Sequence, residues 1–149
     1  MPADTGTKVV PLISSGTAGP LGAIHLPRLW LKLSLAAADA LPEGYDECGS
    51  GFDGMTLSAL GLDRQKTIDF VRSNRPTYME FEAWVVTHGK TDKATIERHN
   101  AAIRGYHHGD ELGKQMRESS KIKDTSVKDA VSLNTVEDLD EVHRHLHRK

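Results

Sequence analysis

The segment AIHLPRLWLKLSLAAADAL, residues 23 to 41, is the most apolar stretch of this 149-residue chain. Pro27 suits the first turn of a helix, because its missing N–H would be unpaired there in any case. Pro42 would end the helix, since its ring and its lost donor break the backbone ladder. The stretch therefore predicts a helix that begins near Pro27 and ends before Pro42. Apolar side chains cover nearly all of its circumference, which is typical of a buried helix.

Three side chains that can be positive nevertheless stand in or beside this segment: His25, Arg28 and Lys32. A helix advances about 100° per residue, so Lys32 and Asp39 lie within about 40° of Arg28 and form one narrow polar edge. One interpretation is a wet edge, with long stems lying along apolar surface. The other is a pocket, in which Arg28 and Lys32 bind a carboxylate or phosphate. His25 would then act as acid or base near neutral pH.

Composition narrows the class of protein. Apolar residues make up 38% and aromatic residues 5%, which predicts a core of Leu, Ile, Val and Ala. A formal net charge of -2 argues against a nucleic-acid partner. No stretch approaches the roughly 20 apolar residues of a membrane helix, so we expect no membrane partner. The single cysteine, Cys48, and the absence of a signal-peptide pattern predict a cytoplasmic location.

Glycines and capping residues organise the first half of the chain. Residues 1 to 22 are rich in Gly, Pro, Ser and Thr without periodicity, and we expect an extended arm that packs through Val9, Val10, Leu12 and Ile13. Residues 43 to 56 hold four glycines and predict a shaped loop, followed by a short helical turn, LSAL. Asp63 can cap the next helix.

Capping signals continue into the second half, and residues 23 to 149 predict one helical domain. Thr77 and Glu80 form a capping box for a helix that ends at Gly89. Thr91 or Asp92 opens another, which residues 111 to 119 extend or restart. A last helix is expected over residues 135 to 149, with Val136, Leu139, Val142 and Leu146 as its apolar stripe. The fold class is all-α: a single compact domain of five or six helices.

Several short motifs together give the chain a family resemblance over residues 19 to 140. They are HLPR followed by Lys (His25, Pro27, Arg28, Lys32), the loop CGSGFDGM with Asp53, LG with Asp63, the helix with Glu80, Glu82 and Trp84, and the segment TIERHNAAIRG. In these residues the chain resembles a bacterial family known as domain of unknown function 5069 (DUF5069). The family often has an aromatic pair where this chain reads SVKDAVSLN. The resemblance implies a fold but no activity.

Our first functional interpretation is a domain with a pocket for an anionic small molecule. Arg28 and Lys32 would bind the anion, and Asp53 would orient His25 or contact the ligand. If the chain is an enzyme, His25 is the acid or base, Asp53 is its catalytic partner, and no cofactor is needed. Trp84 is typical of a core residue, but placed over His25 it would form the floor of the pocket.

Two other classes of function remain open. A non-catalytic, homo-oligomeric interaction module would pack the apolar arc of residues 29 to 41 on a second subunit and pair Arg28 with an acid such as Asp53. A metal-dependent enzyme would draw on the eight histidines, either His107 and His108 or the pair His143 and His147, which are four residues apart. Cys48 is a nucleophile only if the fold brings His25 close to it.

Overall fold

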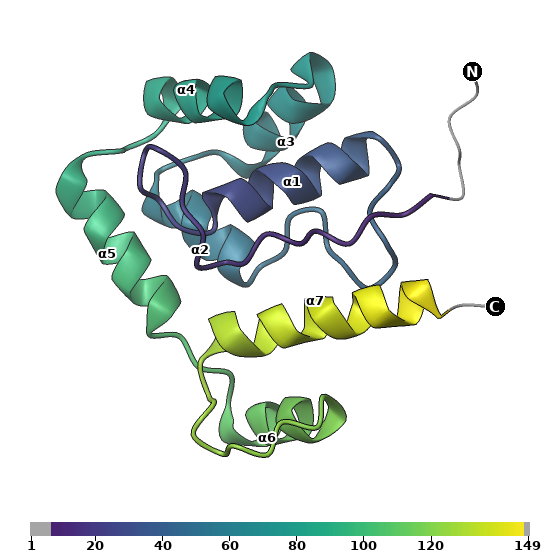
Figure 1. Cartoon of the computed structure of the whole chain (residues 1–149). Coiled ribbons are helices and arrows are strands. Elements are labelled where there is room, and N and C mark those ends of the chain that lie inside the picture. Colours follow the sequence, from purple (N-terminus) through teal and green to yellow (C-terminus); the bar gives the residue numbers. More distant parts are fainter. Residues whose placement is uncertain (1–6, 148–149) are drawn as a thin grey trace.

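Seven helices and no strand make up residues 7 to 147, the part of the chain that the computed structural model describes (Figure 1). The helices are α1 (Leu26–Ala37), α2 (Phe52–Ala59), α3 (Arg64–Asn74), α4 (Tyr78–His88), α5 (Lys93–Arg104), α6 (Asp110–Ser119) and α7 (Ala130–Leu146). Residues 1 to 6 and 148 to 149, which the sequence assigns to the arm and the last helix, lie outside the described residues. The expectation of a single all-α domain is confirmed.

Helix α2 is longer than expected, and α6 is the restarted helix that was one of the two expected alternatives for residues 111 to 119. We expected residues 43 to 56 to be a loop, but α2 begins at Phe52 and runs through Gly54. A glycine inside a helix costs about 1 kcal/mol, and burial of Phe52 and Leu57 offsets that cost. Residues 110 to 119 form the separate helix α6, because Gly105 ends α5.

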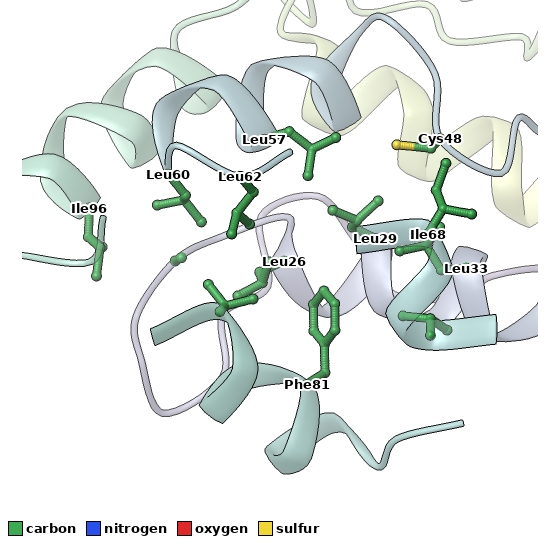
Figure 2. Packing of buried hydrophobic residues seen from close by; sticks show 13 residues of the cluster. Leu26, Leu29, Leu33, Cys48, Leu57, Leu60, Leu62, Ile68, Phe81 and Ile96 are labelled. Carbon is green, nitrogen blue, oxygen red and sulfur yellow. The ribbon is translucent and has the colours of Figure 1, made fainter. Parts of the chain in front are cut away.

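Helix α1 supplies the centre of the core. Leu26, Leu29 and Leu33 are fully buried at helical spacing and pack with Val71 of α3 and Phe81 of α4. Figure 2 shows these leucines converging on the ring of Phe81 between the helices. Figure 1 shows α3 and α4 on one side of α1 and α7 on the other. The proline signals therefore delimited the right helix, which ends at Ala37, four residues earlier than the expected limit.

The capping predictions are confirmed at the N-termini of three helices. The Asp63 carboxylate accepts from the Lys66 amide at 2.8 Å, and Thr77 and Glu80 form a complete capping box. Asp92, rather than Thr91, caps α5.

The expected boundaries and buried face of α7 were wrong. Asp129 caps this helix, so it begins at Ala130 and not at residue 135. Its buried side chains are Ala130, Leu133 and Asp138, whereas Leu139 and Leu146 of the expected stripe are 57% and 75% exposed. The helix is rotated because the Asp138 carboxylate faces inward and pairs with Arg28 of α1.

The described part of the arm, residues 7 to 22, has no regular helix or strand and runs along α1 toward α2 (Figure 1). It is held mainly by polar contacts: Arg28 donates to the carbonyl oxygens of Pro11 at 2.8 Å and Ile13 at 3.0 Å. Of the apolar arm residues that we expected to pack, Val10 is buried, but Val9 and Leu12 are exposed, so that expectation was wrong for these two. Within residues 7 to 147, every helix is too short or too polar to cross a lipid bilayer.

Candidate functional site

A continuous hydrogen-bonded chain links the arm, the start of α1 and the start of α2. The Ser15 hydroxyl lies 2.9 Å from Nδ1 of His25, and the other ring nitrogen, Nε2, lies 2.7 Å from Oδ1 of Asp53. The second carboxylate oxygen of Asp53 accepts from Nζ of Lys32 at 2.5 Å and from the Gly49 amide at 2.7 Å. Ser15, His25 and Asp53 are each at most 3% exposed. The structure thus brings together the predicted pair His25 and Asp53, and adds Ser15.

The surroundings fix the ionisation of this chain. Burial alone raises the pKa of Asp53, but the hydrogen bond from His25 and the charge of Lys32 outweigh burial and lower that pKa to about 2. Burial lowers the pKa of His25, and the hydrogen bond to Asp53 recovers only part of the shift. At neutral pH Asp53 is therefore an anion and His25 is neutral.

These ionisation states assign the protons. An ionised carboxylate can only accept, so Nε2 of His25 carries a proton and donates it to Asp53. A neutral imidazole has one protonated nitrogen, which leaves Nδ1 with a lone pair. The hydroxyl of Ser15, 2.9 Å away, must then be the donor to Nδ1. His25 is a base whose lone pair already faces a hydroxyl proton.

The backbone of His25 is held in an unfavourable conformation. Its φ of 70° and ψ of -23° lie in the left-handed region, where a residue other than glycine costs about 1–3 kcal/mol. Side chains of α5 impose it: Asn100 accepts from the Ile24 amide at 3.0 Å and donates to the Gly22 carbonyl at 2.8 Å, and Nε2 of His99 lies 2.9 Å from the Ile24 carbonyl. Strain of this kind is concentrated at functional sites.

A partly open cavity of about 220 Å³ lies beside the chain, and we call it the His25 cavity. Ser15, His25, Lys32 and Asp53 line it, together with Phe52, Tyr106, His108 and Asn134. The Phe52 ring meets the rings of His25 and Tyr106 edge to face, each at 5.6 Å. A second cavity of about 460 Å³ shares Arg28 and Lys32 with the first and is lined by several acidic side chains of α7.

Arg28 is also buried at this place, and the protein itself occupies the donors of Nη1 and one donor of Nη2. Nη1 lies 2.6 Å from Oδ2 of Asp138, and Nη2 lies 3.2 Å from Oδ1, so the pair is bidentate. The same Nη1 donates to two arm carbonyls. Tyr45 donates to Asp138 at 2.9 Å and completes this cluster. The acid that pairs with Arg28 is therefore Asp138 and not Asp53.

Lys32 keeps more of its donor capacity. It has three ammonium protons, and among residues 7 to 147 its one hydrogen-bond acceptor is Asp53. Its side chain is 10% exposed and lines both cavities. Lys32 thus has ammonium protons left for a ligand.

Trp84 does not belong to this site. Its ring stacks between Phe70 at 4.9 Å and His88 at 4.4 Å, and it packs on the core of α1, α3 and α4. It is not among the residues that line the His25 cavity. Cys48 lies in the same apolar core (Figure 2), where burial raises the pKa of its thiol.

The histidines outside the site were candidate metal ligands. Across residues 7 to 147, no group of three or more His, Cys, Asp or Glu side chains is placed to hold a metal ion. His143 and His147 do lie together, with ring centroids 4.4 Å apart. Asp140, one turn earlier, instead accepts from Ser120 at 2.6 Å.

No protein-family model matches the chain, and no curated protein matches it at a significant level.

Proposed function

We propose that the His25 cavity binds a small carboxylate and that His25 transfers a proton there, as the base of a cofactor-independent enzyme. The observation that carries this proposal is the hydrogen-bonded chain of Ser15, His25 and Asp53 on the cavity wall. The direction of these hydrogen bonds makes His25 a neutral base, and the last donor in the series is the Ser15 hydroxyl, which lies on the cavity wall. Proton transfer to a ligand passes through that hydroxyl.

Lys32 supports the carboxylate part of the proposal. Its unoccupied ammonium protons can bind a carboxylate oxygen with charge assistance. The cavity walls carry Arg28 and Lys32 but also Asp46 and Asp53, so the positive charges are balanced. A singly charged carboxylate therefore suits the site better than a doubly charged phosphate. A volume near 220 Å³ favours a small ligand, because pockets for drug-sized ligands measure about 300–1,000 Å³.

A thermal-shift titration with small carboxylates, against chloride at equal ionic strength, tests the binding step. A ligand that binds only the native state raises the Tm with concentration. The rise should appear in the wild type and in Lys66→Gln, which removes an exposed lysine of α3, and should be lost in Lys32→Gln. The rise is compared within each variant, so a lower starting Tm does not affect the result. Equal rises in Lys32→Gln and wild type would refute the proposal.

A non-catalytic homo-oligomer is the second candidate. It is favoured by Leu139 and Leu146, which lie two turns apart on α7 and are exposed. The surface would be α7 rather than residues 29 to 41, since Leu29 and Leu33 fill the chain's own core. Light scattering of the wild type and of Leu139→Gln/Leu146→Gln tests it: a dimer that dissociates in the variant supports it, and a wild-type monomer at high concentration removes it.

Family membership and location complete the proposal. We propose that the chain belongs to the bacterial DUF5069 family and acts in the cytoplasm. Two of the shared motifs meet at the site: HLPR supplies His25 and Arg28, and TIERHNAAIRG supplies the His99 and Asn100 side chains that hold the His25 loop. A single buried thiol, Cys48, is compatible with a reducing compartment.

A further inference from the structure

We propose that Ser15 is a nucleophile, and that the site transfers or hydrolyses the acyl group of a small carboxylic ester or thioester. This inference rests on the proposed function, because it uses the same cavity and the same base. Sequence analysis did not single out Ser15, which lies in the arm ten residues before His25. The fold brings its hydroxyl to 2.9 Å from Nδ1 of His25 and onto the cavity wall.

The three groups have the relation of nucleophile, base and orienting acid. The Ser15 proton points along an existing hydrogen bond toward the lone pair of His25, so no rearrangement is needed to remove it. Asp53 accepts from the opposite ring nitrogen at 2.7 Å and stabilises the imidazolium that forms. The ring is turned relative to the usual hydrolase arrangement, with the hydroxyl on Nδ1 and the carboxylate on Nε2.

We assign Asn134 as the donor for the oxygen that becomes negative. The Oδ1 atom of Asn134 faces Nε2 of His108 at 3.1 Å, which directs the other end of the amide, its NH₂ group, elsewhere. Asn134 lines the same cavity as Ser15. An amide donor next to a developing oxyanion typically contributes about 10²–10³ in rate.

The proposed reaction balances without a further reactant except water. Oγ of Ser15 bonds to the carbonyl carbon while its proton moves to Nδ1 of His25, and the C=O electron pair moves to oxygen. When that pair returns, the bond to the leaving alkoxide or thiolate breaks, and the leaving group takes the proton from His25. Water, deprotonated by His25, then releases the acid and restores the Ser15 hydroxyl.

A role for Ser15 in fastening the arm explains less of the structure. Arg28 already holds the arm through two carbonyl oxygens, and the His25 amide donates to the Thr17 carbonyl at 3.2 Å. Fastening does not require a neutral buried imidazole on a strained backbone, or a hydroxyl that opens on a cavity. A general base needs a neutral imidazole in contact with the hydroxyl, and a nucleophile needs a cavity from which a substrate can reach it.

A fluorophosphonate, which phosphonylates an activated serine as the P–F bond breaks, tests the assignment directly. Intact mass and peptide mapping of the full chain should show one adduct, on Ser15, in the wild type and in the neighbouring control Ser14→Ala. Ser15→Ala should not be labelled, and His25→Gln should be labelled at least about 100-fold more slowly. Hydrolysis of 4-nitrophenyl acetate should follow the same order, and circular dichroism checks that each variant is folded.

The outcomes separate this inference from the proposed function. Labelling of Ser15 that depends on His25 supports the inference. A wild type that binds carboxylates through Lys32 but is not labelled overturns the inference and leaves the proposed function standing. Labelling of Ser15→Ala at the wild-type rate overturns it as well. If the wild type neither binds carboxylates nor is labelled, both proposals fall.

Discussion

His25 shows how burial and one partner select the chemistry of a side chain. The ring is 2% exposed, and its two nitrogens face a carboxylate and a hydroxyl. The lowered pKa of His25 keeps it neutral at pH 7, which is the form a base needs. Lys32 keeps Asp53 ionised and so fixes the direction of every hydrogen bond in the chain.

The free energy of unfolding should therefore fall as the pH drops below about 6.5. An unfolded histidine binds its proton near that pH, whereas folded His25 resists it, so stability is complete above this pH and is lost on acidification. Burial also lowers the pKa of His99, so His25→Gln should reduce the pH slope without removing it. Urea unfolding at pH 7.5, 6.5 and 5.5 measures how the free energy of unfolding changes with pH in the wild type and in His25→Gln. Identical pH slopes in the two proteins would contradict a lowered pKa of His25.

Removing the charge of Asp53 should cost much of the stability. Asp53→Asn leaves the buried ammonium of Lys32 without its counter-charge, and breaking a buried pair in this way typically costs about 3–5 kcal/mol. Asp69→Asn, on the exposed face of α3, is the matched control and should change little. Chemical unfolding at pH 7 measures the free energy of unfolding of both variants. Equal losses in the two variants would show that the buried pair of Lys32 and Asp53 does not stabilise the fold.

At the scale of elements, α5 positions the site without touching it. Asn100 supplies both hydrogen bonds that fix the loop before α1, and His99 supplies a third contact. Helix α7 both positions and lines the site, because its inward Asp138 sets which face packs and its Asn134 lies on the wall of the His25 cavity. Positioning of the site is thus distributed over helices that are distant in sequence.

Asn100→Ala should weaken both stability and site chemistry. The variant leaves the amide of Ile24 without an acceptor, and an unsatisfied group of this kind costs about 1–3 kcal/mol. Asn74→Ala, at an exposed position on α3, is the control. The free energy of unfolding and the labelling rate of Ser15 should both decrease in Asn100→Ala and stay unchanged in Asn74→Ala. If Asn100→Ala were as stable as the wild type but its Ser15 were labelled more slowly, the loop before α1 would affect the chemistry and not the stability.

The same elements show what sequence could and could not predict. Pro27, Asp63 and the Thr77–Glu80 pair are local signals, since each acts on backbone within one turn, and the helices they mark are present. The rotation of α7 could not be predicted, because its cause is Arg28, 110 residues away from Asp138. Ser15 was missed for the same reason: only the path of the arm places it on His25. The cationic edge of α1 does lie beside the His25 cavity, although its charges are paired internally.

At the scale of the whole molecule, Arg28 joins three distant segments. Its guanidinium holds the arm through Pro11 and Ile13, and α7 through Asp138, while its own helix α1 packs on α3 and α4. The arm carries Ser15, so the same contacts that close the fold also complete the site. Stability and site assembly should therefore be lost together when Arg28 is changed.

Arg28→Met should release the arm and α7 together. Hydrogen exchange should become faster over residues 9 to 17 and in the first half of α7, and the loss of stability should be about 3–5 kcal/mol because Asp138 is left buried without its partner. Arg28→Lys should recover only part of it, since an ammonium cannot form the bidentate pair. Faster exchange confined to one of the two segments would show that Arg28 does not couple them.

The protonation of His25 at neutral pH is the most direct test of the account. Nitrogen-15 NMR of the imidazole rings in the folded chain distinguishes the two neutral tautomers from the imidazolium. We predict a neutral His25 with its proton on Nε2 and a bare Nδ1 that accepts from Ser15. A protonated Nδ1, in either the other tautomer or the imidazolium, would contradict the account, because the ring would then have no lone pair to offer the hydroxyl.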